Sequence, residues 1–156
     1  MSSGSFEVQG LAELDAKLAE LDNATAGKAL FSALNAGATP MVKAAKAKAA
    51  IAAHQHNMQY GGGYVVVDPG LLKSSIKKRR LTKGEHAIAV EQGAAVAVYI
   101  GKGNGGLYPR YWHFLEDGTA KMAAVPFLRP AFDENKEAAV QAFADKLKKN
   151  IDKLTS

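Results

Sequence analysis

The spacing of apolar residues changes twice along this chain, and this change limits the folds that it can adopt. Between residues 11 and 21, leucines recur at steps of three and four, the spacing of an amphipathic helix. From 77 to 100 apolar and polar residues largely alternate, as in strands, and from 132 to 154 the helical spacing returns. The sequence therefore predicts an α+β fold: an antiparallel β-sheet of three to four strands packed with an N-terminal helix, a long alanine-rich helix and a C-terminal helix.

The predicted sheet is a meander of strands at 77–83, 86–92 and 95–100, separated by glycine-containing turns. A further short strand is expected at 6–9, just before the first helix. The C-terminal helix is predicted to begin at Pro130, because proline is favoured at the first helical position.

The alanine-rich segment from residue 26 to about 53 has strong intrinsic helix propensity. Pro40 lies inside it and has no backbone N–H, so we expect a kink or a break near Gly37 to Thr39. Thr39 would then cap a second half of the helix that starts with Pro40.

The length of 156 residues is typical of one domain, and we expect residues 1–156 to form a single α+β domain. Clusters of glycine predict flexible loops near 54–64 and 101–108. The chain has no cysteine, which excludes disulfides and thiolate metal sites. No secretory signal and no membrane-spanning run is recognisable, so a cytosolic product without a membrane partner is expected.

Chemical motifs are sparse. His54 and His56 lie in a glycine-flanked segment without a nearby carboxylate, which favours an exposed polar loop over a metal site. His113 has no marked serine or cysteine nucleophile to activate. The glycines at 101–106 lack the order of a phosphate-binding loop. The sequence therefore predicts no catalytic residue, no metal and no cofactor.

The chain carries a net charge of +5, and its densest basic run is Lys77, Lys78, Arg79 and Arg80. On a strand these cations project alternately to both faces, so at most two can meet one phosphate track. No aromatic residue lies between them to stack on bases. An edge strand protected from aggregation by its charge is the favoured interpretation, and contact with DNA is the alternative.

The segment from Tyr111 to Phe132 combines aromatic residues with a carboxylate, a turn glycine and an arginine between two prolines. Large apolar groups in a connecting segment need a surface to bury against, either a core or an interface. The candidate interface residues are Tyr111, Trp112, Phe114, Glu116, Phe127 and Arg129. Phe114 and Phe127 could equally fill the core, whereas Trp112 and Arg129 are the better interface candidates. Glu116 and Arg129 could form an ion pair, within the chain or between subunits, or stay solvated.

Three stretches resemble one protein family. Residues 6–14, Phe-Glu-Val-Gln-Gly-Leu-Ala-Glu-Leu, are similar to its opening, and Gly70-Leu-Leu-Lys-Ser-Ser-Ile is similar to its central element. Tyr111, Phe114, Glu116, Gly118 and Thr119, followed by Pro126-Phe-Leu-Arg-Pro-Ala, resemble its most specific block. The family is the tail-component proteins of long-tailed bacteriophages, of the type first named in the coliphage Hong Kong ninety-seven.

This resemblance implies a structural virion protein of the neck or tail, assembled in the cytoplasm of the host bacterium, with no catalytic residues. Such a protein completes the tail and joins it to the head as part of a homo-oligomeric ring, a hexamer or a dodecamer. Its implied partners are a head-side connector or stopper protein and a tail terminator or tail tube protein, with nonspecific contact to DNA in the channel. A terminator ring that caps the tail tube is the close alternative. A small basic nucleic-acid-binding protein is the alternative from another class.

Overall fold

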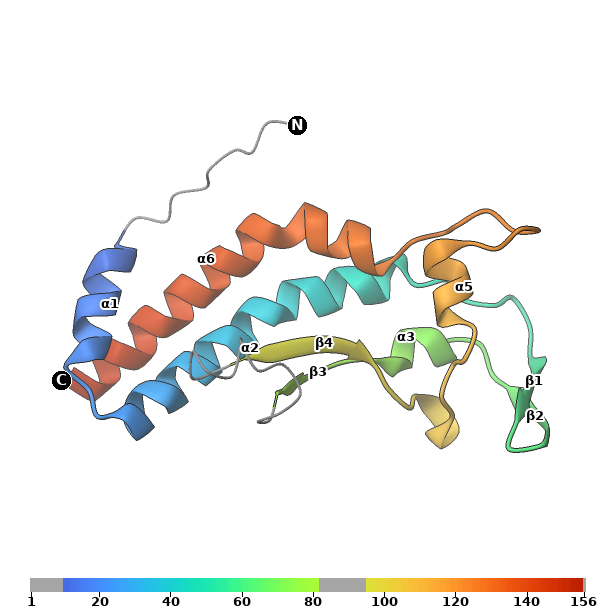
Figure 1. Ribbon diagram of the computed structural model, residues 1–156, viewed down its shortest axis with the longest axis horizontal. Coiled ribbons are helices and arrows are strands. Elements are labelled where there is room, and N and C mark those ends of the chain that lie inside the picture. Colours follow the sequence, from blue (N-terminus) through green and yellow to red (C-terminus); the bar gives the residue numbers. More distant parts are fainter. Residues whose placement is uncertain (1–9, 82–94, 156) are drawn as a thin grey trace. The chain divides into compact units, whose positions relative to one another are not determined.

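The computed structural model describes residues 10–81 and 95–155, and they form helices and short strands (Figure 1). In chain order the elements are α1 (Leu11–Ala19), α2 (Asn23–Lys48), β1 (His56–Tyr60), β2 (Gly63–Val67), α3 (Leu71–Ser75), β3 (Ile76–Arg80), β4 (Val96–Ile100), a 3-10 turn η1 (Asn104–Gly106), α5 (Trp112–Asp117) and α6 (Leu128–Thr155). The predicted α+β class is confirmed.

The prediction of one sheet is wrong for the described residues, because the strands form two separate antiparallel pairs. β1 pairs with β2 through a two-residue turn, and β3 pairs with β4. The β3–β4 ladder continues beyond the strands, where Leu81 N–H donates to Ala95 O and Gly101 N–H donates to Ser75 O. The strands predicted at 6–9 and 86–92 lie outside the described residues.

The chain divides into two compact units, and each is described by itself. Unit 1 contains the described residues 10–41, 78–81, 95–97 and 135–155, and unit 2 contains 42–77 and 98–134. The prediction that residues 1–156 form a single domain stays a prediction.

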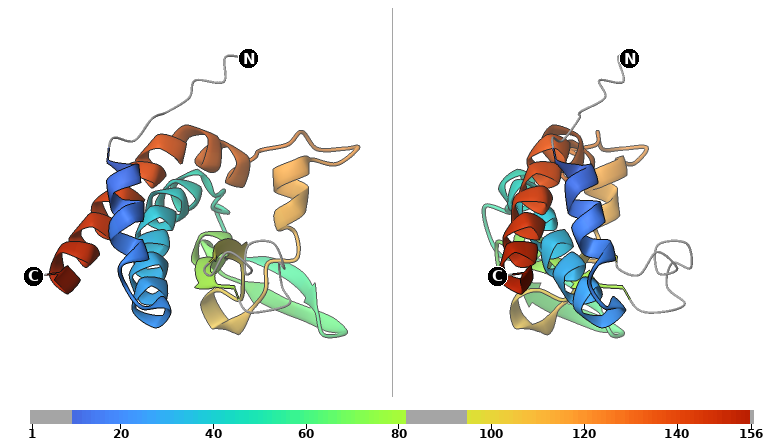
Figure 2. Two further views of the ribbon diagram at one scale, coloured as in Figure 1. Left: turned by 60° about the vertical axis from the view of Figure 1, so that its left-hand side comes forward. Right: turned by 90° about the vertical axis from the view of Figure 1, so that its left-hand side faces the viewer.

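In unit 1, α1 and the adjoining parts of α2 and α6 lie side by side (Figure 2). Their shared core consists of Leu14, Ala29, Ala33, Leu147 and Ile151. The helices approach closely at Gly37, where an added Cβ would lie 3.0 Å from Ala139 O and 3.2 Å from Phe143 Cβ. The small residues of the alanine-rich segment therefore allow α2 to pack tightly against α6.

The alanine-rich segment has no break near Gly37 to Thr39: α2 runs from Asn23 to Lys48 without interruption, with Pro40 inside it, and the alternative, a kink, stays a prediction. Thr39 is a residue of the helix rather than a cap, and its hydroxyl donates to Asn35 O at 3.1 Å. Lys78 Nζ donates to Asn35 O at 2.9 Å and to Thr39 Oγ1 at 2.6 Å. These bonds place polar contacts beside the carbonyl of Ala36, which loses its helical donor because Pro40 has no N–H.

Unit 2 has two adjoining apolar clusters. One consists of Ala45, Ala49, Leu72, Ile76, Phe127 and Ala131. The other consists of Met58 and Val67, from the β1–β2 hairpin, and Leu71 of α3. Tyr111 contacts both clusters.

The two predicted loops have more regular structure than the glycine pattern indicated. Residues 54–64 contain β1, and their glycines form the hairpin turn, with φ of 60° at Gly61 and 87° at Gly62. Such positive φ angles are typical of the tight turn that matches strand twist. The segment 101–108 is fastened to α3, since Asn104 N–H donates to Ser74 Oγ at 2.9 Å. The flexibility of both segments stays a prediction.

Candidate functional site

The start of α6 is capped by a side chain from another helix, α5. Glu116 Oε2 receives the backbone N–H groups of Phe127 at 2.8 Å and Leu128 at 3.0 Å. Glu116 Oε1 receives the N–H of Arg129 at 2.9 Å. The next residue, Pro130, has no N–H, so one carboxylate satisfies the donors that begin this helix. This cap explains why α6 begins at Leu128, two residues before the predicted start.

The Arg129 side chain fastens the same junction from outside. Its Nη2 donates to Glu116 O at 3.1 Å, and its Nε lies 3.5 Å from Glu116 Oε1. The guanidinium also lies 3.7 Å from Asp117 Oδ1. The side chain of Glu116 is only 7% exposed, whereas that of Arg129 is 68% exposed. The ion pair predicted for Glu116 and Arg129 is thus present within the chain, with one buried and one exposed partner.

Burial raises the pKa of the Glu116 carboxyl group, because desolvation disfavours the charged form. The backbone N–H groups of Leu128, Phe127 and Arg129, together with the Arg129 side chain, lower it by more. The net pKa lies below the usual range, so the carboxylate stays charged while it caps the helix.

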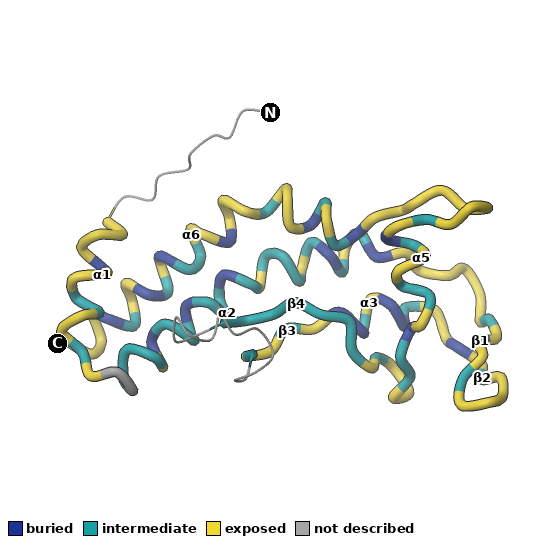
Figure 3. Tube along the Cα trace, viewed as in Figure 1, coloured by how far each residue is buried: buried dark blue, intermediate teal, exposed yellow. Residues whose placement is uncertain are grey.

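The Glu116 cap closes a segment of eight consecutive exposed residues, 119–126 (Figure 3). Val125 N–H donates to Leu115 O at 2.7 Å, and Thr119 and Met122 form an antiparallel bridge. Lys121 is the only charged residue of this exposed loop, which exposes 40% of Met122 and 53% of Val125. It is therefore an apolar projection that hydrogen bonds hold at both ends.

The predicted interface residues divide between the interior and the surface of unit 2. Phe127 is fully buried in the core, and Tyr111 is half-buried, which raises its pKa through desolvation. Trp112 is half-buried, with Nε1 donating to Tyr108 Oη at 2.8 Å. Phe114 is 48% exposed, with its ring centroid 4.5 Å from that of His113.

The structure thus brings Glu116, Phe127 and Arg129 together, with Phe114 exposed on α5 nearby in sequence. The interface role of all six residues stays a prediction. Sequence reasoning missed the exposed loop residues Met122 and Val125. Their signal was a nearly uncharged run, Ala-Lys-Met-Ala-Ala-Val, between a turn glycine and a proline.

The basic run on β3 is divided by the alternation of the strand. Lys78 donates to the backbone of α2, and the Arg80 guanidinium lies 5.1 Å from the centroid of the Phe31 ring. Lys77 and Arg79 project to the opposite face. Lys78 and Arg80 thus contact α2, Arg79 Nη1 donates to Arg80 O at 3.5 Å, and contact of any of the four with DNA stays a prediction.

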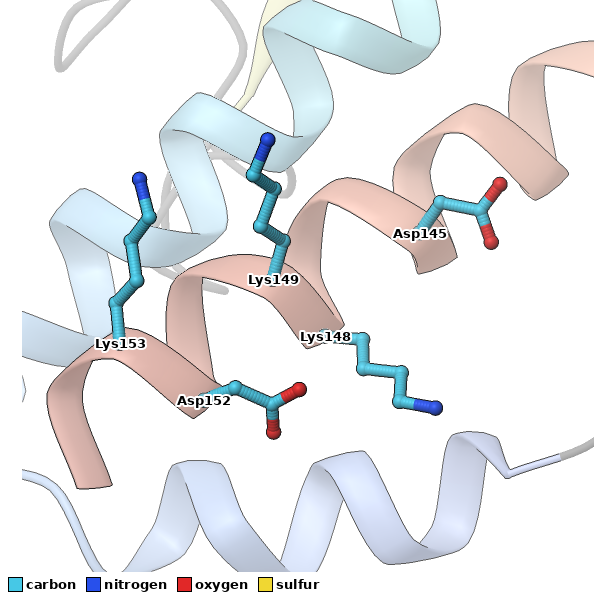
Figure 4. A pocket seen from close by; sticks show the side chains of 5 residues that line it. All are labelled: Asp145, Lys148, Lys149, Asp152 and Lys153. Atoms are coloured by element: carbon cyan, nitrogen blue, oxygen red, sulfur yellow. The ribbon is translucent and has the colours of Figure 1, made fainter. Parts of the chain in front are cut away.

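A shallow hollow on α6 has the side chains of Asp145, Lys148, Lys149, Asp152 and Lys153 along its lining (Figure 4). Lys149 and Lys153 point to one side of the helix, whereas Lys148 and Asp152 point to the other. Asp152 lies 3.9 Å from Lys17 Nζ, and Asp145 accepts a hydrogen bond from Gln141. Because the groups carry both signs and diverge, they do not form a convergent anion site.

Two other kinds of site are absent from the described parts of the chain. Across residues 10–81 and 95–155, no three metal-ligating side chains gather into a potential metal site. No described helix has the length and apolar character required to cross a bilayer.

The sequence matches the family described as "Bacteriophage HK97-gp10, putative tail-component" over residues 12–118, well over half of the chain. The chain therefore belongs to this family of bacteriophage tail components. The match includes the central element at 70–76 and the segment from Tyr111 to Gly118, and it ends before the loop and the start of α6. Searches of curated proteins and of solved structures gave no significant match. Membership of the family supports a structural role in the tail and argues against an enzyme.

Proposed function

We propose that this protein is a structural component of the phage neck that completes the tail and joins it to the head-side connector as part of a ring. The coarser role, a tail component, follows from the family. The finer role rests on the α5–α6 junction, where the chain presents an apolar exposed loop whose ends are held by hydrogen bonds.

The exposed loop 119–126 is the observation that carries the proposal. Exposed apolar side chains that are already held in place lose little conformational freedom on binding, which favours association. Phe114 and Arg129 flank the loop in the chain and belong to residue types that contribute strongly to interfaces. The Glu116 cap keeps the loop ends together through one buried and one partly buried hydrogen bond. A ring requires a contact between two different patches of neighbouring subunits, and this loop supplies one patch.

Complementation of particle assembly tests the proposal. Heads and tails are prepared from infected cells that lack this protein, and the purified protein is then added. We expect joined particles in electron micrographs, with ring density at the junction. Heads and tails that stay separate contradict the joining role. Tail tubes of abnormal length in the cells without the protein indicate a terminator instead.

A matched pair of phenylalanines identifies the surface involved. Phe114 and Phe132 are exposed to similar extents, 48% and 51%, and both belong to unit 2. Phe114→Ser is expected to reduce joining strongly, whereas Phe132→Ser retains it. Circular dichroism verifies that both variants are folded. Equal joining by the two variants contradicts the assignment of the interface to α5 and its loop.

A further inference from the structure

The β1–β2 hairpin contains no Asp, Glu, Lys or Arg, and it has two edges that lack a partner among the described strands. From residue 49 to 67 the sequence contains no Asp, Glu, Lys or Arg, although charged residues make up 22% of the chain. Among the described strands, β1 and β2 pair only with each other. Each strand therefore has one edge that no described strand covers.

The two faces of the hairpin differ in burial. His56, Met58 and Tyr60 alternate along β1 on the face that packs onto unit 2, where Met58 pairs with Val65. The opposite face carries Asn57 and Gln59 from β1 with Tyr64 and Val66 from β2. Tyr64 is 77% exposed and Val66 61% exposed. β2, which consists largely of β-branched and aromatic residues, thus has one open edge and one exposed face.

An open strand of this kind normally carries a protective feature. Lysines, prolines or bulges on edge strands prevent unwanted pairing with other chains. β3, the strand with the basic run, has four cations among its five residues, whereas β2, Gly-Tyr-Val-Val-Val, has no charge and no proline. Short uncharged segments of high β-propensity pair readily with further strands. The unprotected edge of β2 is therefore suited to pairing.

The turn indicates which backbone groups are available. A two-residue turn closes on a hydrogen-bonded pair, here Tyr60 with Gly63, and such pairs alternate along an antiparallel ladder. The outward backbone groups are then those of Asn57 and Gln59 on β1 and of Tyr64 and Val66 on β2. These residues also form the exposed face, so backbone and side chains are available together.

We infer that hairpins of neighbouring copies of this chain pair edge to edge, with β2 of one copy beside β1 of the next. This inference rests on the proposed ring and identifies a second contact within it. The charge of each strand indicates which strand of a neighbouring copy can lie beside β2. A charged strand would bring its charges against Tyr64 and Val66, at a cost in desolvation, and this disfavours β3. β1 instead places the neutral amides of Asn57 and Gln59 beside them.

The same pairing also fits a closed ring. Each hairpin is antiparallel, so hairpins that point in one direction continue the sheet with antiparallel pairs. A contact between two different edges closes by rotation and leaves no edge open. Two-fold pairing of β2 with β2 would leave β1 uncovered in every copy.

Cysteine crosslinking tests the inference, and the natural absence of cysteine makes the background clean. Asn57→Cys and Gln59→Cys are each mixed with Tyr64→Cys or Val66→Cys, all in the full chain. Each mixture is added to heads and tails from infected cells that lack the protein. The assembled particles are oxidised and analysed on a non-reducing gel. A single cysteine per chain excludes crosslinks within one hairpin.

We expect disulfide-linked dimers in at least one mixture, because adjacent strands bring Cβ atoms within about 5.5 Å across a pair, and no dimers from any variant alone. Dimers from Val66→Cys alone indicate two-fold pairing and overturn the inference. Particles that contain the variants but show no crosslink in any mixture overturn it as well.

A charge placed on the open edge provides a second test. Val66→Lys gives β2 the protection that it lacks, and we expect ring assembly to be lost while the circular dichroism spectrum is retained. Val140→Lys is the matched control, because it makes the same change at an exposed position of α6. Normal rings from Val66→Lys overturn the hairpin pairing and leave the proposed ring intact. Unjoined heads and tails with the unmodified protein contradict the proposed function itself.

Discussion

Two helices of this protein contain a proline close to a charged side chain that binds the helix backbone. The side chain is negatively charged in one helix and positively charged in the other. At the start of α6, near Pro130, the carboxylate of Glu116 receives backbone N–H groups. In the middle of α2, near Pro40, the ammonium of Lys78 donates to a backbone carbonyl. At the start of α6 the acidic group binds backbone N–H groups that have no partner within the helix. In α2 the basic group binds a backbone carbonyl next to the one that lacks a donor because of the proline.

The difference between the two places is one of burial and number of bonds. Glu116 is buried and accepts three backbone N–H groups at the positive end of the helix. Lys78 is half-buried and donates to Asn35 O and Thr39 Oγ1. We therefore expect the α6 cap to contribute more to the free energy of unfolding than the α2 contact. We also expect the contribution of the cap to decrease at acidic pH.

The largest expected effect is that of Glu116→Ala. It leaves the N–H groups of Phe127, Leu128 and Arg129 without their acceptor, at a cost of about 2–4 kcal/mol in the free energy of unfolding. Asp117→Ala is the control, because this neighbouring carboxylate is 71% exposed and caps no N–H group of α6. Its substitution should change the unfolding free energy by no more than about 0.5 kcal/mol. Urea unfolding measures both, and equal losses would contradict the importance of the cap.

The acid dependence of the same cap gives the second prediction. The folded pKa of Glu116 lies below its unfolded value of about 4.3, so the unfolded chain takes up the proton first as pH falls. The contribution of the cap is therefore fully present above the unfolded pKa and is lost as pH falls through the folded pKa. We expect the stability difference between the unmodified protein and Glu116→Gln to shrink from pH 5 toward pH 3, in urea unfolding at each pH. A constant difference across that range contradicts a charged cap.

A smaller loss is expected for Lys78→Met, which removes the donor to Asn35 O and Thr39 Oγ1 but keeps the apolar stem. The loss should be about 1–2 kcal/mol. Lys77→Met is the matched control on the opposite face of the strand, with an expected change within about 0.5 kcal/mol. Equal losses of unfolding free energy for Lys77→Met and Lys78→Met would contradict the assignment of Lys78 to the face of the strand that contacts α2 and of Lys77 to the opposite face.

The comparison also separates what the sequence could predict from what it could not. Apolar spacing predicted α1 and α6, because each buries a periodic face such as Leu147 and Ile151. For Glu116 and Arg129 the sequence left an ion pair within the chain, an ion pair between subunits and solvated side chains as alternatives, and the structure has the first. The main function of Glu116, capping α6, was not foreseen, because the cap joins residues 11 to 13 positions apart through backbone groups that sequence does not display.

The errors concern tertiary contacts, turn geometry and strand pairing, which residue spacing alone does not display. Pro40 predicted a kink or a break in the alanine-rich helix, but the helix is unbroken, and Lys78, from a strand 38 residues later in the chain, binds at this turn. The glycines of 61–63 predicted a loop, but the positive φ angles of Gly61 and Gly62 allow a tight hairpin whose inner face packs on Leu71. A single sheet was predicted from alternation alone, which does not indicate which strands become partners.

The smallest expected effect tests whether proline and lysine act together in α2. Pro40→Ala restores an N–H that can donate to Ala36 O, so the free energy of unfolding should rise by about 1 kcal/mol. The double variant with Lys78→Met should then lose less than Lys78→Met does alone, with a coupling of about 0.5 kcal/mol, because a continuous hydrogen-bond ladder depends less on the ammonium. Urea unfolding of the four proteins of this double-mutant cycle measures the coupling. Strict additivity would show that Lys78 binds at this turn independently of the proline. The two sites would then resemble each other in geometry but not in energetics.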